Sequence, residues 1–237
     1  MAADLGLAGK TVVLTGAGGA IGRAIAAVFQ DLGSRLVLLD RDVSALPPGA
    51  RTIPCDVRDA ASVERAFAEA AATGGIDHLV LAAGIYRPSP LAQMTDADWN
   101  DTLAVNLQGA FHCCRAAAPR MNKGGSIVAL SSIAGQRGSA TFSHYAASKG
   151  GLLSFVRSLA TELAPDIRVN AVSPGPIDSP MVAPLMEKRG PQILAQTPLG
   201  RIGTPDEVAR AVAFLASDWA SYITGESLQV NGGAYLS

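Results

Sequence analysis

Cysteine and charged residues are both scarce in this sequence of 237 residues. The three cysteines, Cys55, Cys113 and Cys114, are an odd number and two of them are neighbours, so neither a disulfide framework nor a metal site is indicated. Charged residues make up 16% of the chain, the formal net charge is −1, and no long basic run occurs. This balance argues against nucleic acid or an anionic membrane as a partner.

Long apolar runs are missing as well. No apolar segment approaches the ~18 residues of a membrane-spanning helix. The first ten residues lack the basic start and apolar run of a secretory signal, so we expect a cytoplasmic protein with reduced thiols. Hydrophobic residues, in contrast, make up 49% of the chain, which is enough for one domain over residues 1–237 with a sizeable core.

Short apolar runs alternate with longer helical patterns along the chain. This alternation predicts a single-domain, Rossmann-type α/β fold, with a doubly wound, mainly parallel sheet and helices on both faces. Thr204, Pro205 and Glu207 are typical of a helix start, with Thr204 as the N-cap. The expected strands are 11–15, 35–39, 51–55, 78–83, 126–130, 168–173 and 227–230, and the expected helices include 59–73, 146–163 and 205–217.

A glycine-rich turn at residues 16–22, with the sequence GAGGAIG, joins the first strand to the first helix. A strand, a glycine turn and a helix in this order let the backbone approach a phosphate at the helix N-terminus. Gly16, Gly18 and Gly22 would serve the tight turn, the backbone approach and the packing of helix on strand. For this turn taken alone, an ordinary glycine-rich connection is an equal alternative.

The second strand ends in Asp40, which is followed by Arg41. An acidic residue about twenty positions past such a turn is where the 2′-hydroxyl of an adenosine ribose would be bound. A plain turn residue is the alternative, but position and chemistry both favour the ribose. We therefore expect NAD as the cofactor, because the 2′-phosphate of NADP would meet a like charge there. Arg41 is the neighbour that could offset this repulsion.

Tyr145 and Lys149 lie four residues apart, so on a helix they share one face. A nearby ammonium favours the phenolate, which would lower the pKa of the tyrosine from its usual ~10 and bring it nearer to a working acid or base. Ser132, at the exit of the preceding strand, could offer its hydroxyl to the same substrate oxygen. For the pair alone, a surface tyrosine beside a solvated lysine is the plainer interpretation.

Taken together, the motifs resemble the short-chain dehydrogenase/reductase family. The resemblance is carried by Ser132, by Tyr145 thirteen residues later, and by the Ala-Ser-Lys that ends at Lys149. It extends from residue 10 to residue 233 and implies an oxidoreductase that interconverts a small-molecule ketone and a secondary alcohol by hydride transfer with NAD. It also implies a homo-oligomer, a dimer or a tetramer, built through the long helices after strands four and five.

The resemblance assigns roles to four catalytic residues. Tyr145 donates or accepts the proton, Lys149 tunes it and holds the nicotinamide ribose, Ser132 polarises the carbonyl, and Asn106 supports a water relay to the lysine. On its own, Asn106 could be a polar core residue at a helix kink. The cofactor-binding residues that we expect are Gly16, Gly18, Ala20, Ile21, Gly22, Asp40, Arg41, Asp56, Val57, Ala83, Gly84, Tyr145, Lys149, Pro174, Gly175, Ile177 and Ser179.

Three positions depart from the family's pattern. Ala20 stands where the middle glycine of the turn is usual, Ala82 replaces an asparagine that braces the sheet, and Asn231 replaces an aspartate. The departure at Ala20 bears on cofactor affinity and not on the fold.

The stretch at about 176–203 is rich in proline and carries several apolar residues. A structureless segment of this length in a compact domain is usually functional, so we interpret it as a substrate lid. The alternative is a surface excursion that packs its own apolar side chains. Together with the loop at residues 85–91, it suggests a mostly apolar substrate pocket.

Three other functions share parts of this pattern. The nearest is an NADPH-dependent 3-oxoacyl-carrier-protein reductase, against which stand Asp40, Gly19 and Asp166, the last two at positions where such relatives are often basic. A nucleotide-sugar epimerase or dehydratase shares Tyr-x-x-x-Lys but carries a larger substrate region after Pro174. A non-enzymatic NAD-binding regulator has no need of the four catalytic residues.

Overall fold

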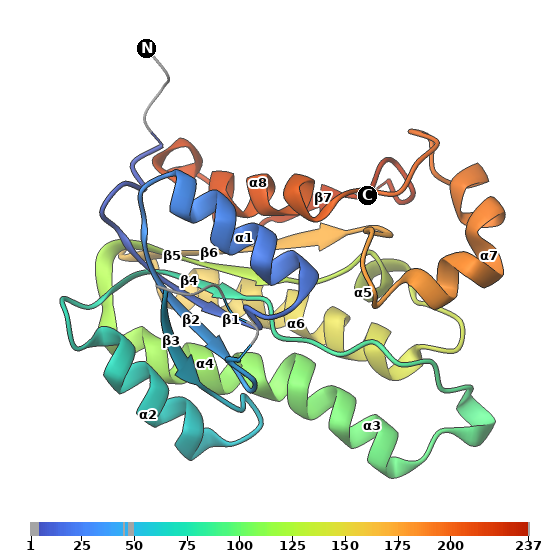
Figure 1. Cartoon of the computed structure of the whole chain (residues 1–237), viewed down its shortest axis with the longest axis horizontal. Coiled ribbons are helices and arrows are strands. Elements are labelled where there is room, and N and C mark those ends of the chain that lie inside the picture. The colour runs from blue at the N-terminus through green and yellow to red at the C-terminus, as the bar shows by residue number, and fades with distance from the viewer. Residues whose placement is uncertain (1–4, 45, 47–49, 237) are drawn as a thin grey trace.

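A single sheet of seven parallel strands forms the middle layer of the molecule (Figure 1). The computed structural model describes residues 5–44, 46 and 50–236. The strand order is β3-β2-β1-β4-β5-β6-β7, so the chain winds outward from β1 in one direction and then returns to wind outward from β4 in the other. The strands are β1 (Thr11–Thr15), β2 (Arg35–Asp40), β3 (Arg51–Pro54), β4 (Ile76–Leu81), β5 (Met121–Leu130), β6 (Ile167–Pro174) and β7 (Ser227–Val230).

Helices cover both faces of the sheet, α1 and α8 on one and α2, α4 and α6 on the other (Figure 1). The α-helices are α1 (Ala20–Asp31), α2 (Ala60–Ala71), α3 (Asp96–Leu103), α4 (Gly109–Ala117), α5 (Ala134–Arg137), α6 (Ser143–Glu162), α7 (Ala183–Ala195) and α8 (Pro205–Ala216). A π-helical turn, Ala104–Gln108, joins α3 to α4, and short 3-10 turns lie at Leu91–Gln93, Ala118–Arg120 and Asp218–Ala220. The predicted fold class is confirmed.

The apolar runs of the strands are continuous because both faces of the sheet are covered. In β1, Val13 faces the core under α2, α4 and α6, while Val12 and Leu14 face the core under α1 and α8. All three side chains are fully buried. Neighbouring residues of a strand thus supply two separate cores, as the alternation of side chains along a strand requires.

Most element boundaries agree with the sequence prediction within a few residues. The N-cap at Thr204 is confirmed, since its hydroxyl accepts the Glu207 N–H and the Glu207 carboxylate accepts the Thr204 N–H. β5 begins five residues earlier than expected, at Met121, where it pairs with Ile76 of β4 across a register shift. Exposed Lys123 and Gly124 give this part of the strand no apolar signal.

The expectation that residues 176–203 are structureless is wrong. Residues 183–195 form α7, which projects from the body of the molecule beside the carboxyl ends of the strands (Figure 1). Pro184 lies in the first turn, where a backbone N–H has no helical partner to lose. Pro191 lies inside the helix and removes one backbone donor there. The prolines therefore shape this helix without preventing it.

Candidate functional site

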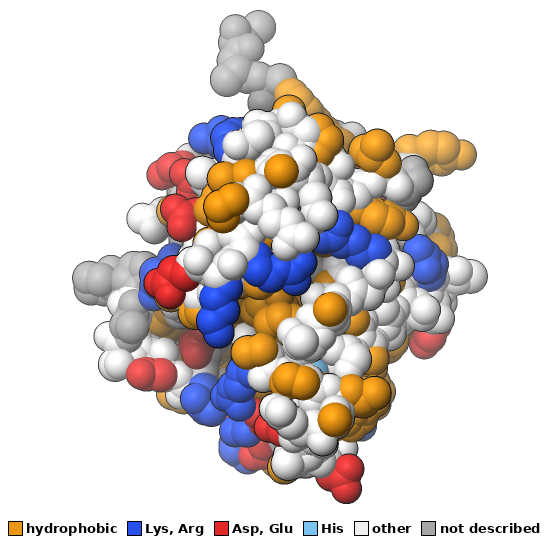
Figure 2. Space-filling model, turned by 90° about the vertical axis from the view of Figure 1, so that its right-hand side faces the viewer, with side chains coloured by type: hydrophobic (Ala, Val, Ile, Leu, Met, Phe, Trp, Pro, Cys, Tyr) orange, Lys and Arg blue, Asp and Glu red, His pale blue; other side chains and the backbone are white. Residues whose placement is uncertain are grey.

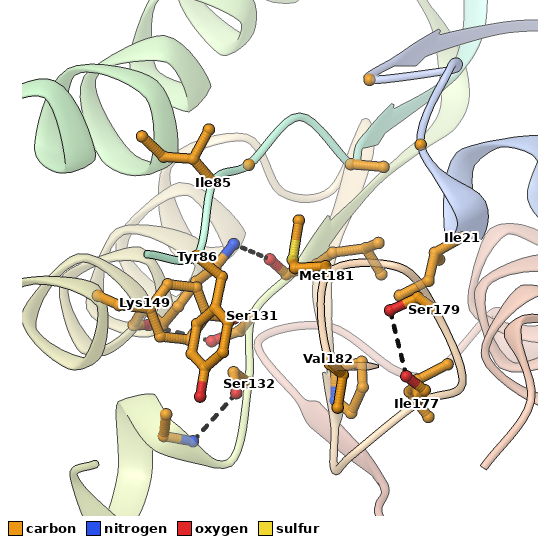
Figure 3. A pocket seen from close by; sticks show the side chains of 18 of the residues that line it. Ile21, Ile85, Tyr86, Ser131, Ser132, Lys149, Ile177, Ser179, Met181 and Val182 are labelled. Atoms are coloured by element: carbon orange, nitrogen blue, oxygen red, sulfur yellow. Dashed lines mark hydrogen bonds between the residues drawn. The ribbon is translucent and has the colours of Figure 1, made fainter. Parts of the chain in front are cut away.

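A cavity of about 680 Å³ opens at the carboxyl edge of the sheet, where the chain leaves β1 and β4 in opposite directions. Such a reversal is where open α/β sheets bind their ligands. Figure 3 shows Lys149, Ser132 and Tyr86 on one side of the cavity, and Ile177, Ser179, Met181 and Val182 on the other. All but one of the predicted site residues line this cavity; the exception is Asn106, which lies behind its wall.

The glycine turn is packed so closely that two of its positions exclude a side chain. Gly16 has φ +69°, and a Cβ atom there would lie 2.5 Å from the backbone nitrogen of Ala83. A Cβ atom on Gly22 would lie 2.1 Å from the carbonyl oxygen of Gly16. Ala20 is the first residue of α1, whose N-cap, Gly19, offers no side chain to the first N–H groups. These groups are available to an anion, as a pyrophosphate site requires.

Asp40 is held against this turn at the end of β2. Its carboxylate accepts the Gly18 N–H at 2.8 Å and the Asp42 N–H at 3.3 Å. Arg41 lines the cavity beside it. A carboxylate fixed in this way is suited to accept hydrogen bonds from two ribose hydroxyls.

Asp56 is tied into a chain of charges that the sequence prediction missed. Arg58 donates to Asp56 at 2.7 Å and to Asp101 at 3.2 Å, and Arg87 donates to Asp101 at 3.0 Å. The hydrogen bond from Arg58 lowers the pKa of the Asp56 carboxyl. The charges connect the β3–α2 turn to the loop that follows β4. No local sequence pattern reveals these ion pairs, because the four residues come from three distant segments.

Ser132, Tyr145 and Lys149 converge on one part of the cavity. Lys149 is 5% exposed on α6, and its Nζ atom donates to the Leu130 carbonyl at 2.7 Å and lies 5.7 Å from the centre of the Tyr145 ring. Ser132 follows β5, shares a hydrogen bond with Tyr145, and accepts the Ala134 N–H at 3.1 Å. The strand and the helix thus bring together the three groups that the spacing predicts to act together.

The expected lowering of the Tyr145 pKa is wrong for this arrangement. Burial raises the pKa of Tyr145 to about 12, against the opposing effect of the hydrogen bond with Ser132. Burial also lowers the pKa of Lys149 to about 8. A site of low polarity disfavours the charged form of both groups, and this outweighs their attraction. Tyr145 therefore carries its proton at neutral pH and can donate it.

Tyr86 fixes the ring of Tyr145 and was not singled out from the sequence. Its own ring stacks on Phe142 with centroids 4.0 Å apart and meets the Tyr145 ring edge-on at 4.7 Å. The loop between α5 and α6 is strained at Thr141, which has φ +66°, a rare value for a β-branched residue. The Thr141 carbonyl accepts the Ser89 N–H at 2.8 Å and so ties this loop to the one that carries Tyr86.

Asn106 lies in the π-helical turn and braces two neighbouring segments. Its Oδ1 atom accepts the Ile85 N–H at 2.8 Å, while Nδ2 donates to the Ile85 carbonyl at 3.0 Å and to Ser148 Oγ at 3.2 Å. A Cβ atom on Gly84 would lie 3.4 Å from Asn106 Oδ1 and 3.6 Å from Lys149 Nζ, so Gly84 lies between the two. The relay role of Asn106 stays a prediction.

The segment after β6 forms the wall opposite Lys149. Ile177 is buried, and its carbonyl accepts Ser179 Oγ–H at 3.2 Å. A Cβ atom on Gly175 would lie 2.9 Å from Asn231, so the two segments are in close contact. Asn231 accepts the Gly233 N–H at 2.8 Å and donates to the Tyr235 carbonyl at 2.9 Å. Asparagine thus keeps an acceptor where the family has aspartate and adds a donor.

Two arginines at the substrate end were also missed. Arg137 closes α5 and Arg189 belongs to α7, and both line the cavity among mostly apolar neighbours, namely Met181, Val182, Leu185 and Ile193. In the sequence they are isolated basic residues, and only the packing of α5 and α7 around one cavity relates them.

Among the described residues no three or more histidine, cysteine, aspartate or glutamate side chains are grouped as a metal ion would require. Within the same ranges no helix is long and apolar enough to cross a membrane.

Comparison with known proteins gives matches over nearly the whole chain. A profile of the family described as enoyl-(acyl carrier protein) reductase matches residues 16–235. The 3-oxoacyl-[acyl-carrier-protein] reductases of Salmonella typhimurium and Escherichia coli are 41% and 40% identical, over 96% of this chain and 98% of their own length.

Solved structures match as closely. A Brucella melitensis protein, titled short-chain dehydrogenase/reductase and glucose/ribitol dehydrogenase, has a TM-score of 0.95 and 45% identity over 100% of both chains. An aldohexose dehydrogenase of Thermoplasma acidophilum has a TM-score of 0.91 and 36% identity over 96% of this chain and 94% of its own.

Proposed function

The chain belongs to the short-chain dehydrogenase/reductase family, and from this premise we propose that it reduces the 3-oxo group of a 3-oxoacyl thioester to a secondary alcohol with NADH. That it is an oxidoreductase follows from the family. The substrate is suggested by the curated relatives, which are named 3-oxoacyl-[acyl-carrier-protein] reductases. We therefore place this substrate ahead of the unspecified ketone that the sequence alone suggested.

The observation that carries the proposal is a protonated Tyr145 beside Ser132 and Lys149 in one cavity. Tyr145 gives its proton to the ketone oxygen, and the Ser132 hydroxyl donates a hydrogen bond to the same oxygen as negative charge develops there. Lys149 lends positive charge to this end of the cavity and would hold the nicotinamide ribose. The bound cofactor supplies the hydride.

The walls of the cavity fit NADH. The glycine turn offers backbone N–H groups to a pyrophosphate, and Asp40 offers a fixed carboxylate to the ribose. Ile177 and Ser179 lie opposite Lys149 across the cavity (Figure 3), and Gly175 also lines it; the nicotinamide would be held between these walls. The choice of NAD over NADP rests on Asp40 alone.

The function is tested by following NADH oxidation with acetoacetyl thioesters, and with acetoin and an aldohexose/aldonolactone pair as rival substrates. Tyr145→Phe should reduce turnover by ~10²–10⁴-fold, since it removes the proton donor and keeps the ring. Tyr222→Phe is the matched control, because Tyr222 is fully exposed and does not line the cavity. Near-normal turnover by Tyr145→Phe would refute the catalytic assignment, and preference for a rival substrate would refute the thioester.

We also propose a homo-oligomer built through α4 and α6. Phe111 of α4 is 41% exposed, with the Arg115 guanidinium 4.8 Å from its ring centre and the Phe155 ring of α6 at 6.5 Å. An aromatic and arginine surface of this kind is typical of the centre of an interface. The mass in solution, measured by light scattering, tests this proposal. A cytoplasmic location stays a prediction.

A further inference from the structure

We propose that the substrate carries an anionic group, a carboxylate or a phosphate ester, beyond its reacting ketone, and that Arg137 and Arg189 bind this group. The inference concerns the substrate end of the same cavity and rests on the proposed function. It makes the substrate more specific than the family or the names of the relatives do.

Arg137 and Arg189 approach the cavity from two different elements. Arg137, the last residue of α5, donates through Nη1 to the Ala234 carbonyl at 2.9 Å. Arg189, in α7, donates through Nε to Gln192 Oε1 at 3.2 Å. Each guanidinium has further N–H groups, because arginine carries five donors. Both side chains line the cavity and are exposed to solvent.

Neither arginine forms an ion pair with a carboxylate in the ranges that the structure describes. Two other arginines that line the cavity, Arg58 and Arg87, pair with Asp101. Arg23 of α1 and Arg41 after β2 line it without an ion pair among the described residues, as Arg137 and Arg189 do at the substrate end. A surface arginine that served only solubility would be free to form an ion pair with a neighbouring carboxylate. The two guanidinium groups at the apolar, substrate end of the cavity therefore keep their charge available to an anionic ligand.

The two ends of the cavity differ in charge. Its acidic lining residues in the described ranges are Asp40, Asp56 and Asp101. Asp40 is held by the glycine turn and the other two by Arg58, so all three belong to the adenosine side. The substrate end has Arg137 and Arg189 without a lining carboxylate. This end is therefore positively charged and should concentrate anions.

Arg189 lies on the side of the cavity where the chemistry is expected. Burial raises the pKa of Tyr86, and the nearby charge of Arg189 opposes this rise. Tyr86 in turn contacts the Tyr145 ring at 4.7 Å. Figure 2 shows basic side chains gathered around a hollow with hydrophobic side chains at its floor, on the face that carries α7. A ketone at Tyr145 would thus extend past apolar residues toward basic ones.

Guanidinium groups fit this task better than single ammonium groups. Their planar donors match the oxygens of a carboxylate or phosphate in a two-pronged geometry. An anion bound by both arginines would also link α7 to α5 across the cavity mouth. The phosphate of a pantetheine arm and a carboxylate on the acyl chain present the same chemistry, and the experiment separates them.

The test compares kcat/KM for three 3-oxoacyl thioesters with NADH. Acetoacetyl-N-acetylcysteamine is neutral, acetoacetyl-4′-phosphopantetheine carries a phosphate, and 3-oxoadipyl-N-acetylcysteamine carries a carboxylate on the acyl chain. We expect the wild type to prefer at least one charged substrate over the neutral one. Which one it prefers identifies the source of the anion. Added salt should reduce this preference.

Arg137→Gln and Arg189→Gln should each lower the charged-to-neutral ratio of kcat/KM by about tenfold, the value of one charge-assisted hydrogen bond. Glutamine removes the charge and keeps a polar side chain with an amide N–H, although this side chain is shorter. Arg210→Gln on α8 is the matched control, because Arg210 is exposed and does not line the cavity. It should keep the ratio of the wild type.

A wild-type ratio near one, or a ratio that neither variant changes, would overturn the inference. If no thioester is reduced, the proposed function fails. The inference about the anionic group is then tested by comparing the reduction of 4-oxopentanoate, a ketone that carries a carboxylate, with that of its neutral methyl ester. Preference for the acid, lost in the two variants, would then support it, and equal rates would overturn it.

Discussion

At the scale of single residues, we expect the carboxylate of Asp40 to set the preference for NADH over NADPH. Its oxygens are already fixed by the Gly18 and Asp42 N–H groups, so the side chain has little freedom to turn away from a 2′-phosphate. Like charges held together cost several kcal/mol, and ~3 kcal/mol corresponds to roughly a hundredfold preference for NADH. Asp40→Ser should reduce this preference, since Arg41 could then pair with the phosphate.

The measurement is kcat/KM for NADH and for NADPH in both proteins. Asp42→Ser is the control, because Asp42 is an exposed residue two positions further on whose carboxylate accepts hydrogen bonds from Ser44, while its bond to Asp40 is made by the backbone N–H, which serine keeps. Equal or better values with NADPH in the wild type would contradict the assignment of Asp40.

The sequence predicted some residues of the site correctly and missed others. The spacing of Tyr145 and Lys149 was sufficient because four residues on a helix define one face. The sign of the Tyr145 pKa shift was missed, since it depends on burial by residues from other segments. Tyr86 and Arg58 were missed for a similar reason: their partners belong to loops that only the fold brings together.

At the scale of elements, α7 is the helix of the site that has few buried residues. It carries one buried residue, Gly190, and contains a proline that removes a backbone hydrogen bond. If α7 closes over the substrate, amide exchange in residues 183–195 should slow when NADH and a substrate analogue are both present. Hydrogen exchange with mass spectrometry measures this, with α8 as the internal control.

Unchanged exchange in α7 would show that it is only a packed surface helix, and equal slowing in α8 would show a general stabilisation.

The sequence predicted most elements because helices and buried strands have distinct apolar periods. It missed α7 because the proline-rich stretch at about 176–203 was interpreted as a structureless lid. It shortened β5 because Met121–Gly125 is held by backbone pairing and not by buried side chains.

For the molecule as a whole, His78 makes stability depend on pH. It is buried in β4, where Nδ1 and Ser126 Oγ share a hydrogen bond of 2.9 Å and Nε2 has no partner in the described residues. Burial lowers the pKa of His78 to about 4; nearby Asp77 and Asp218 oppose this shift, and Arg168 and Lys10 add to it. The folded protein thus holds this histidine neutral where the unfolded chain would protonate it.

Between pH 6.5 and 4 the unfolded chain binds more protons than the folded one, so the free energy of unfolding should fall as the pH falls through this window. The contribution of His78 between pH 7 and 5 is about 2 kcal/mol. His78→Gln should therefore lose less stability than the wild type over this range. Urea denaturation of both proteins at pH 7 and at pH 5 gives the change in the free energy of unfolding between the two pH values. Equal changes in the wild type and in His78→Gln would contradict the prediction.

The residues around the cavity are of two kinds, catalytic residues held by the framework and exposed residues at its rim. Ser132 follows β5 closely and Lys149 is buried in α6, whereas Arg137, Met181 and Arg189 lie exposed on α5 and around α7. Substitutions at exposed positions usually change stability by no more than about 0.5 kcal/mol. A lineage with this fold can therefore exchange one substrate for another by mutating the rim of the cavity, while the catalytic framework is inherited intact.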